Sequence, residues 1–107
     1  MAWLTRGGEV LASAEVALSR SERRKGLIGR TSLDGVFILE AKSVHTFGVR
    51  FPIDVAFCDS TGVVVRIVSM PRNRVCLPVW SAKTAIEAPQ GAFHEWSLSE
   101  GDQLEIR

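Results

Sequence analysis

The sequence predicts a mainly β fold, a compact antiparallel β barrel or sandwich with one short helix. Its 107 residues suit one domain, which we assign to residues 1–107. Several short stretches rich in β-branched and aromatic residues are separated by Gly, Pro and Asp turns, and only one segment carries the signals of a helix start. Such a chain must bury sheet faces against each other, so these stretches predict a closed or sandwiched sheet.

Two stretches near the N-terminus predict an opening hairpin. Trp3–Arg6 and Val10–Leu18 are separated by Gly7-Gly8, a pair that allows a tight turn. The helix should follow at Ser19, because Ser19 and Glu22 have the spacing of a capping box, in which each side chain binds the other residue's backbone amide. We expect this helix to end at about Gly29, with Gly26 weakening its middle.

The rest of the chain predicts strands. Phe47, Val49 and Phe51 alternate along one stretch, and Ile53, Val55 and Phe57 alternate along the next. The turn 59–62 should join the second of these to the following strand as a hairpin. The expected strands are 36–39, 43–51, 53–57, 63–70, 75–80, 84–88 and 103–106. The expected core includes Phe37, Phe47, Phe51, Ile53, Val55 and Phe57, with most of the three tryptophans buried as well.

Composition excludes several classes of protein. Apolar residues make up 46% and charged residues 23%, which is ordinary for a globular chain and not for a disordered, collagen-like or coiled-coil one. No stretch approaches the roughly 20 apolar residues that cross a bilayer, and the N-terminus lacks the apolar run of a signal peptide. We therefore expect a cytoplasmic protein with no membrane partner. In that compartment Cys58 and Cys76 should be reduced thiols.

Four separate blocks of the sequence stand out: SERRKGLIGR at 21–30, VHTFGVRFPIDVAF at 44–57, AIEAPQG at 85–91 and EGD at 100–102. Together, and in this order, they resemble the DUF192 family of small bacterial and archaeal proteins. The resemblance covers the chain from about residue 9 to its end. It implies a compact, mainly β domain with a short helix, and it implies no activity, because the family has no assigned function.

Three polar residues close together in the chain form the candidate ligand-binding site: His45, Arg50 and Asp54. Asp54 interrupts an apolar run, so we expect it to be at least partly buried and held by a cation, with Arg50 the leading candidate, or by backbone amides near Pro52. A carboxylate beside a guanidinium stays ionised and orients an imidazole, which suits proton transfer or a small polar pocket. The alternative is a purely structural pairing of Arg50 with Asp54.

Two functions remain open. The preferred one is a binding or accessory module that presents this polar patch to a small ligand or a partner protein. The other is a small hydrolase-like enzyme that uses Asp54 and His45. No catalytic residue is assigned, because spacing alone supplies no nucleophile geometry. We expect a monomer or weak dimer.

The sequence predicts no metal and no cofactor. Zinc would need Cys58, Cys76, His45 and His94 together, and no two of them have the spacing of a zinc finger.

Basic residues are concentrated in 20–30 and acidic residues in 87–107. The basic segment suits phosphate groups, or it is a solvated face partly neutralised by the acidic segment. We do not expect nucleic acid as a partner, because the basic segment carries no aromatic residue for base stacking. Trp80, after Pro78, is either a core residue or an exposed contact on a loop.

Overall fold

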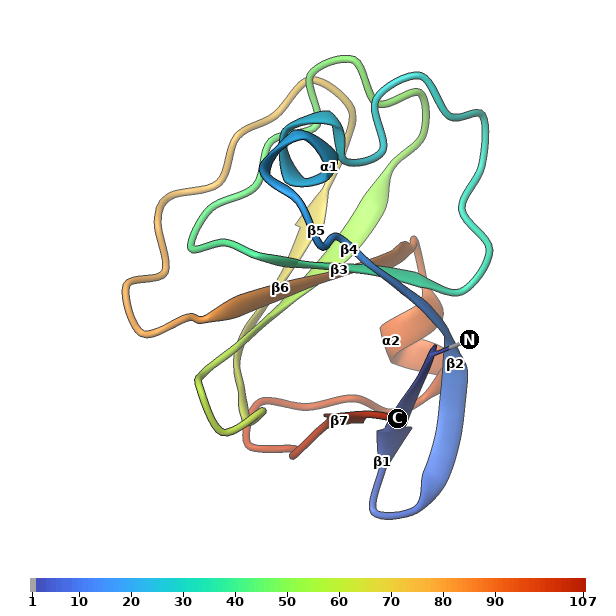
Figure 1. The fold of residues 1–107 in the computed structure, drawn as a ribbon, viewed down its shortest axis with the longest axis vertical. Helices are drawn as coiled ribbons and strands as arrows, with labels where there is room; N and C mark the ends of the chain where they lie inside the picture. The colour runs from blue at the N-terminus through green and yellow to red at the C-terminus, as the bar shows by residue number, and fades with distance from the viewer. Residues whose placement is uncertain (1) are drawn as a thin grey trace.

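The computed structural model describes residues 2–107 and confirms a mainly β domain with the N- and C-termini close together (Figure 1). Its helices are short, and its strands form one sheet. The elements in chain order are β1 (Ala2–Arg6), β2 (Glu9–Val16), α1 (Arg20–Lys25), β3 (Val36–Glu40), β4 (Ile53–Cys58), β5 (Val64–Met70), β6 (Thr84–Pro89), α2 (Ala92–Glu95) and β7 (Glu105–Ile106).

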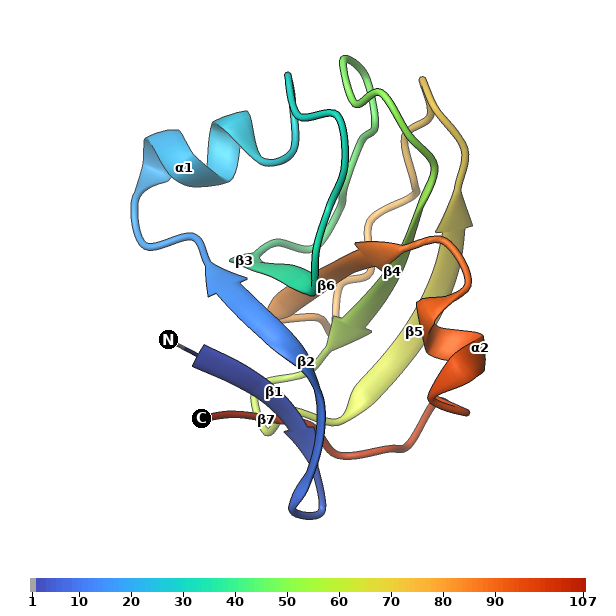
Figure 2. The same ribbon diagram turned by 90° about the vertical axis from the view of Figure 1, so that its right-hand side faces the viewer.

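The sheet is mixed and strongly curled. Its strand order is β5-β4-β6-β3-β2-β1-β7, and neighbouring strands are antiparallel except for β2 and β3, which are parallel. A parallel pair needs a crossover connection, and α1 lies on that connection, beyond the end of β2 and above β3 in Figure 2. The antiparallel β fold expected from the sequence is confirmed, with this one parallel pair as the exception, and the sheet is curled into a half-barrel.

The two edges of the sheet meet at one end. Val63 and Gln103 form an isolated antiparallel bridge, and the amide of Val64 donates to the carbonyl of Asp102 at 2.8 Å. The amide of Leu104 donates to the carbonyl of Gly62 at 2.9 Å. Gly62 has a φ of 89°, and a Cβ at this position would collide with the carbonyl oxygen of Leu104. This glycine therefore allows the backbones of the two edges to approach closely.

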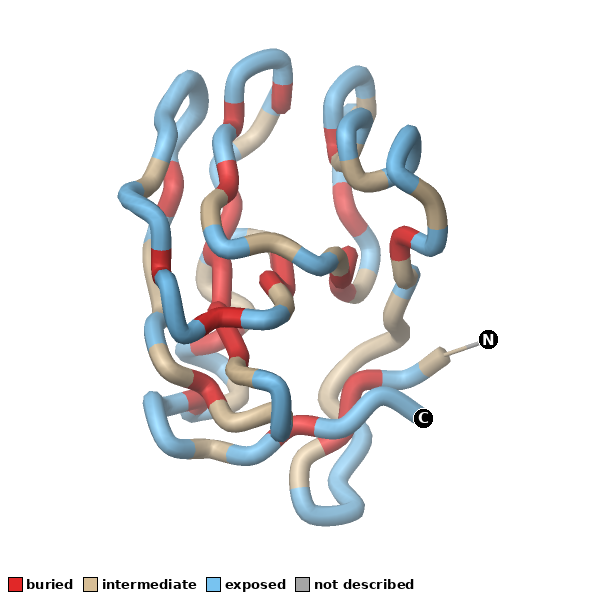
Figure 3. The backbone as a smooth tube through the Cα atoms, turned by 60° about the vertical axis from the view of Figure 1, so that its left-hand side comes forward, coloured by how far each residue is buried: buried red, intermediate tan, exposed pale blue. Residues whose placement is uncertain are grey.

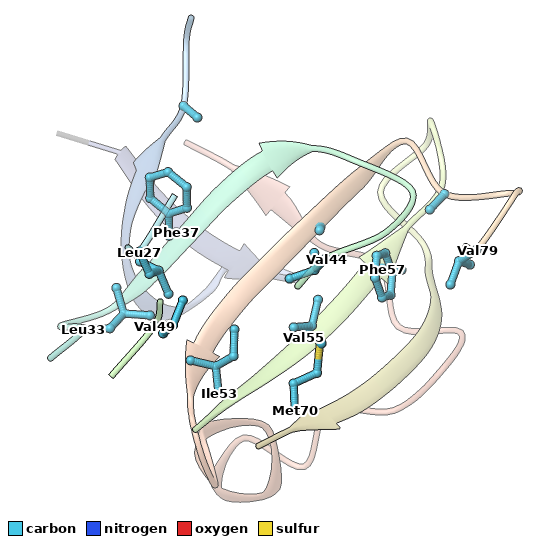
Figure 4. Packing of buried hydrophobic residues seen from close by; sticks show 13 residues of the cluster. Leu27, Leu33, Phe37, Val44, Val49, Ile53, Val55, Phe57, Met70 and Val79 are labelled. Carbon is cyan, nitrogen blue, oxygen red and sulfur yellow. The ribbon is translucent and has the colours of Figure 1, made fainter. Parts of the chain in front are cut away.

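The central strands are buried on both faces, and all six residues of β4 are buried (Figure 3). Odd-numbered residues of β4 pack into a cluster under α1 and the loops that follow β3 and β5, which includes Leu27, Phe37 and Val49 (Figure 4). Even-numbered residues Ala56 and Cys58 pack into a second cluster with α2 and β1. Each face of the sheet thus has its own core.

Helix α1 begins as expected and ends earlier. The hydroxyl of Ser19 accepts from the amide of Glu22 at 3.0 Å, and the Glu22 carboxylate accepts from the amide of Leu18 at 3.3 Å. The expected end at about Gly29 is wrong, because Gly26 adopts a φ of 50° and stops the helix at Lys25. A turn carries the chain on to Arg30.

Two expected strands are loops instead. The segments 43–51 and 75–80 pair only through a bridge between His45 and Val75. The chain reverses where the amide of Val49 donates to the carbonyl of Thr46, so the alternation of Phe47, Val49 and Phe51 never lies along a sheet. Thr46 is buried here together with Val44 and Val49. Its hydroxyl donates to the carbonyl of Pro71 at 2.6 Å and accepts from the amide of Arg74 at 2.9 Å.

The core prediction is confirmed for four of its residues: Phe37, Ile53, Val55 and Phe57 are all buried. Phe51 is partly buried, and the prediction for Phe47 is wrong, because its side chain is 52% exposed on the loop. Trp80 was expected to be either a core residue or an exposed residue on a loop. It is 77% exposed, so the second alternative is correct. Trp3 is also exposed and Trp96 partly buried, so the expected burial of most tryptophans is wrong.

Helix α2 was not expected from the sequence. It begins after Gly91, which has a φ of 90°, and it buries Phe93. No helix within residues 2–107 is long and apolar enough to cross a membrane.

Candidate functional site

A cavity lies between α1 and the sheet. Its empty space is about 420 Å³, including the part open to solvent. Arg24 and Lys25 of its lining are exposed and Arg23 is partly buried, so we call this side the mouth. Glu87 is buried, so we call its side the floor, and the remaining lining is mostly apolar. We call it the α1 cavity. Its lining is Arg23, Arg24, Lys25, Gly26, Leu27, Ile28, Leu39, Ser43, Val44, His45, Val49 and Glu87.

Glu87 is placed at the floor by the alternation of β6. Ile86 and Ala88 point into the core under α2, so Ala85 and Glu87 point toward α1. In the sheet, Glu87 is paired with Phe37 on β3 and with Val55 on β4, both of which are buried. A carboxyl that faces a core from a central strand is uncommon, because burial of a charge is costly.

The carboxyl of Glu87 has no local partner. The residue is only 5% exposed, and no side chain or backbone amide among residues 2–107 makes a hydrogen bond or ion pair with it. Burial raises the pKa of Glu87 to about 7, and the positive charge of Arg30 offsets this only in part. Near neutral pH this carboxyl exchanges a proton readily, and perturbed groups of this kind in clefts are typical of functional sites.

Arg30 lies close enough to influence Glu87 while it binds elsewhere. Its guanidinium forms two hydrogen bonds with the carboxylate of Glu15, at 3.0 and 2.6 Å, and lies 5.4 Å from the ring centroid of Phe37. These contacts raise the pKa of Arg30 and lower that of Glu15. The positive charge of Arg30 therefore acts on Glu87 from a distance. Because the guanidinium is paired with Glu15, it does not form an ion pair with Glu87.

Three cations at the mouth of the cavity come from the end of α1: Arg23, Arg24 and Lys25, which we call the cationic rim. Their placement near a helix C-terminus is favourable for positive charge. Among the ion pairs and side-chain hydrogen bonds of residues 2–107, none involves these three side chains. Of the acidic segment 87–107, Asp102 pairs with Arg6 and Glu105 with Arg107, and none of its residues forms an ion pair with the rim. Glu87 is the residue of that segment that shares the cavity with the rim.

His45 is the one predicted site residue that lines the α1 cavity. Its side chain is exposed, and its ring centroid lies 5.7 Å from that of Phe47. The neighbouring Ser43 hydroxyl already donates to the carbonyl of Cys76 at 2.9 Å. The histidine is therefore available to a ligand, whereas the serine hydroxyl is engaged in holding the two loops together.

Asp54 lies on the other face of the sheet. It is buried, as expected, and its carboxylate accepts from the hydroxyl of Ser69 at 3.0 Å and from the amide of Gly91 at 2.9 Å. The expected partner was Arg50 or an amide near Pro52, and both expectations are wrong, because the even-numbered side of β4 faces α2. Asp54 thus fixes the start of α2 to the sheet.

The three predicted site residues do not share a cavity. His45 lines the α1 cavity, Asp54 lines a separate depression beside α2 with Phe93 and His94, and Arg50 is exposed on the loop before β4. Sequence reasoning missed Glu87. The signal was present, since Glu87 interrupts the apolar run of β6 just as Asp54 interrupts that of β4.

The cysteines lie apart from the α1 cavity. Cys58 is buried and Cys76 partly buried, and both are free thiols, as expected. Burial raises the pKa of the Cys58 thiol to about 11, which makes it a poor nucleophile. Within residues 2–107 no three His, Cys, Asp or Glu side chains are grouped as metal ligands.

The model of the family DUF192, described as "Uncharacterized ACR, COG1430", matches residues 2–106. The chain belongs to the DUF192 family. It is 32% identical to the "UPF0127 protein PF1050" of Pyrococcus furiosus over 108 aligned positions, which cover 95% of this chain and 93% of that protein. The family resemblance inferred from the four sequence blocks is confirmed.

Two solved structures share the fold of this DUF192 protein. One is a protein of unknown function from Novosphingobium aromaticivorans, with a TM-score of 0.82 and 19% identity over 97% of this chain and 82% of that chain. The other, from Sinorhizobium meliloti, is described as "a putative transcription regulator", with a TM-score of 0.82 and 19% identity over 98% of this chain and 91% of that chain. At this level of identity the two structures establish the fold alone.

Proposed function

We propose that this DUF192 protein is a small-molecule-binding module and that the α1 cavity is its ligand site. The observation that carries the proposal is Glu87, a buried carboxyl that has no partner in the protein and faces a cavity. Among residues 2–107 no fully buried side-chain oxygen lacks a hydrogen-bond partner, so the oxygens of Glu87 stay in contact with the cavity space. A ligand donor can therefore reach this carboxyl and form the hydrogen bond that the protein does not supply. The apolar walls with a few convergent polar groups are the usual composition of a ligand pocket.

The preferred function from the sequence is retained with a different set of residues. Of the site residues predicted from the sequence, the proposed site retains His45 and leaves out Arg50 and Asp54. It adds Glu87 and the cationic rim. Asp54 accepts hydrogen bonds from Ser69 and from the amide of Gly91 at the start of α2. These contacts support a structural role for Asp54 and not a role in ligand binding.

A thermal-shift screen tests the proposed function. A panel of amino acids, phosphorylated metabolites and neutral sugars is added to the wild type, to Glu87→Gln and to Glu100→Gln. Glu100 is exposed and lies outside the α1 cavity, so its variant is the matched control. A ligand that binds only the native state raises the melting temperature. We expect at least one compound to stabilise the wild type and Glu100→Gln, and to lose most of this effect in Glu87→Gln.

Two results would overturn the proposal. The first is that no compound of the panel stabilises the wild type. The second is that every compound that does so stabilises Glu87→Gln equally, or shifts NMR amide signals only outside the α1 cavity.

An enzymatic function has one observation in its favour. A carboxyl with a pKa near 7 in the same cavity as an exposed His45 is suited to general acid–base catalysis. The hydrolase-like pair proposed from the sequence, Asp54 and His45, has no such support, since the two line different cavities. Incubation of each hit compound with the wild type, followed by NMR, distinguishes binding from turnover. Turnover that is lost in Glu87→Gln, while binding of the product persists, would favour the enzyme.

The description of the Sinorhizobium protein raises nucleic acid as an alternative partner. A helix that enters the DNA major groove presents several residues to the bases, whereas α1 has six residues and α2 has four. The cations of α1 also line a cavity with a buried carboxyl, which is unfavourable for a phosphate backbone. These features support a small ligand over nucleic acid, and a gel-shift assay with duplex DNA at low salt tests the point.

A further inference from the structure

We infer that the ligand of the α1 cavity is a small zwitterion, with a carboxylate or phosphate bound by the cationic rim and a protonated amine bound by Glu87. This inference rests on the proposed function and specifies the chemistry of its ligand. It follows from the distribution of charge in the cavity, from mouth to floor.

The mouth of the cavity selects an anionic group. Arg23, Arg24 and Lys25 all line it and have no acidic partner among residues 2–107. A guanidinium presents paired donors that match the oxygens of a carboxylate or a phosphate, and an ammonium adds a point charge. Glu22, the acidic residue of α1, does not line this cavity. A ligand with a positive group at the mouth would be repelled.

The floor of the cavity selects a hydrogen-bond donor. Glu87 is the acidic residue of the lining, and its oxygens make no hydrogen bond within the protein. An ammonium group donates up to three hydrogen bonds and brings the positive charge that an ionised buried carboxylate lacks. An anion without a donor would leave Glu87 unpaired and would face its negative charge.

The walls between the mouth and the floor are apolar. Leu27, Leu39, Val44 and Val49 line this part, with Leu27, Val44 and Val49 themselves buried. Apolar walls between two oppositely charged ends fit a short methylene chain, because its CH₂ groups lose water contact without losing hydrogen bonds. The ligand class is therefore an amine and an anionic group separated by a few methylenes.

Binding should release protons below neutral pH. The charged groups that face Glu87 are the cationic rim from α1, Arg30 from the segment after α1, and His45 from the loop after β3. Of these groups, Arg30 favours the ionised carboxylate, and burial disfavours it more strongly. A bound ammonium further favours the ionised form of Glu87. At pH 6 the carboxyl of Glu87 in the free protein holds its proton, and we expect ligand binding to release this proton.

Isothermal titration and NMR with defined probes test the inference. The probes are 4-aminobutyrate and O-phosphoethanolamine as zwitterions, butyrate as an anion alone, butylamine as a cation alone and 1-butanol as a neutral compound. We expect a zwitterion to bind at least about tenfold more tightly than the three single-ended or neutral probes, since each lost charged hydrogen bond has about that effect. The comparison of the two zwitterions shows whether the anionic group is a carboxylate or a phosphate.

Variants assign each end of the ligand. In the triple variant Arg23→Gln, Arg24→Gln and Lys25→Gln, affinity for the zwitterion should fall to that of butylamine. In Glu87→Gln it should fall to that of butyrate, and proton release at pH 6, measured from the buffer dependence of the heat, should vanish. The matched control replaces three exposed arginines outside the cavity, Arg66, Arg72 and Arg74, by Gln and should bind as the wild type does.

The outcomes separate the inference from the proposed function. If butylamine or 1-butanol binds as tightly as the zwitterions, or if only uncharged compounds of the thermal-shift panel bind at the α1 cavity, the zwitterion inference is wrong and the proposed function stands. The inference is also wrong if the triple variant keeps wild-type affinity. If neither the probes nor the panel bind at the cavity, both fail.

Discussion

Glu87 on β6 is paired in register with Phe37 on β3, so a carboxyl lies beside a buried aromatic ring in the middle of the sheet. No protein group among residues 2–107 forms a hydrogen bond with this carboxyl, and burial raises its pKa to about 7. A carboxyl in this position lowers the stability of the folded protein when it is ionised, because burial disfavours the charge. A ligand that pairs with the carboxyl offsets that loss, which is why we place the binding site here.

Stability should depend on pH through Glu87. The folded protein holds this proton up to a pKa of about 7, whereas the ordinary value is 4.5, so the contribution of Glu87 is fully present below 4.5 and is lost as pH rises through about 7. The difference corresponds to roughly 3 kcal/mol. In Glu87→Gln this fall should be absent. Urea unfolding of both proteins from about pH 4.5 to 8 checks it. Parallel pH curves for the two proteins would contradict the burial of the carboxyl.

Phe57 and Phe47 provide a matched pair for the core. Phe57 is fully buried, so Phe57→Ala should lower the free energy of unfolding by about 3–5 kcal/mol. Phe47 is 52% exposed on a loop, so Phe47→Ala should lower it by less than about 1 kcal/mol. Denaturant unfolding measures both. Equal effects of the two substitutions would show that the loop 43–51 is packed differently.

The comparison of these two phenylalanines shows what the sequence could and could not predict. Alternation identified the side of β4 that packs under α1, because successive side chains of a strand point to opposite faces of the sheet. The same alternation in 43–51 was misleading, since Thr46 forms hydrogen bonds with the backbone of the segment 71–74, and only the folded structure brings the two segments together. Helix α1 ends early because Gly26 adopts a positive φ. Glycine adopts positive and negative φ about equally well, so the sequence alone did not predict this conformation.

The candidate site was only partly predictable for a related reason. His45, Arg50 and Asp54 are close in sequence, but β4 sends Asp54 to the α2 side, whereas His45 lies under α1. The elements of the α1 cavity come from three separated parts of the chain, and their assembly depends on the parallel crossover between β2 and β3. The sequence did contain a signal for Glu87, because this residue interrupts an apolar strand. Nothing in the sequence indicated the cavity.

Gly62 and Gly8 test the closure of the sheet edges. Both have a positive φ, 89° and 87°, so an alanine is strained at either position. At Gly62 the added methyl would also collide with the carbonyl of Leu104, whereas at Gly8 it meets no atom within 4 Å. We expect Gly62→Ala to lower the melting temperature clearly more than Gly8→Ala does. Equal changes would indicate that the edges do not meet at Gly62.

Asp54 should behave as a structural residue. Asp54→Asn can still accept from the Gly91 amide and can donate to the Ser69 hydroxyl, but both hydrogen bonds lose the charge of the carboxylate. We therefore expect a loss of about 1 kcal/mol in the free energy of unfolding. Asp34→Asn, at an exposed position, is the control. Ligand affinity per folded molecule should be unchanged in Asp54→Asn. A loss of affinity without a loss of stability would instead return Asp54 to the binding site.

The central claim, that a buried carboxyl without a protein partner forms the floor of a ligand site, is tested most directly by the titration of Glu87 itself. The side-chain carboxyl carbon of Glu87, assigned by its absence in Glu87→Gln, is followed by ¹³C NMR against pH in the free protein and with 4-aminobutyrate. The account predicts a pKa of about 7 in the free protein and a lower pKa when the probe is bound. A carboxyl in the free protein that titrates at its ordinary value of 4.5 would contradict it.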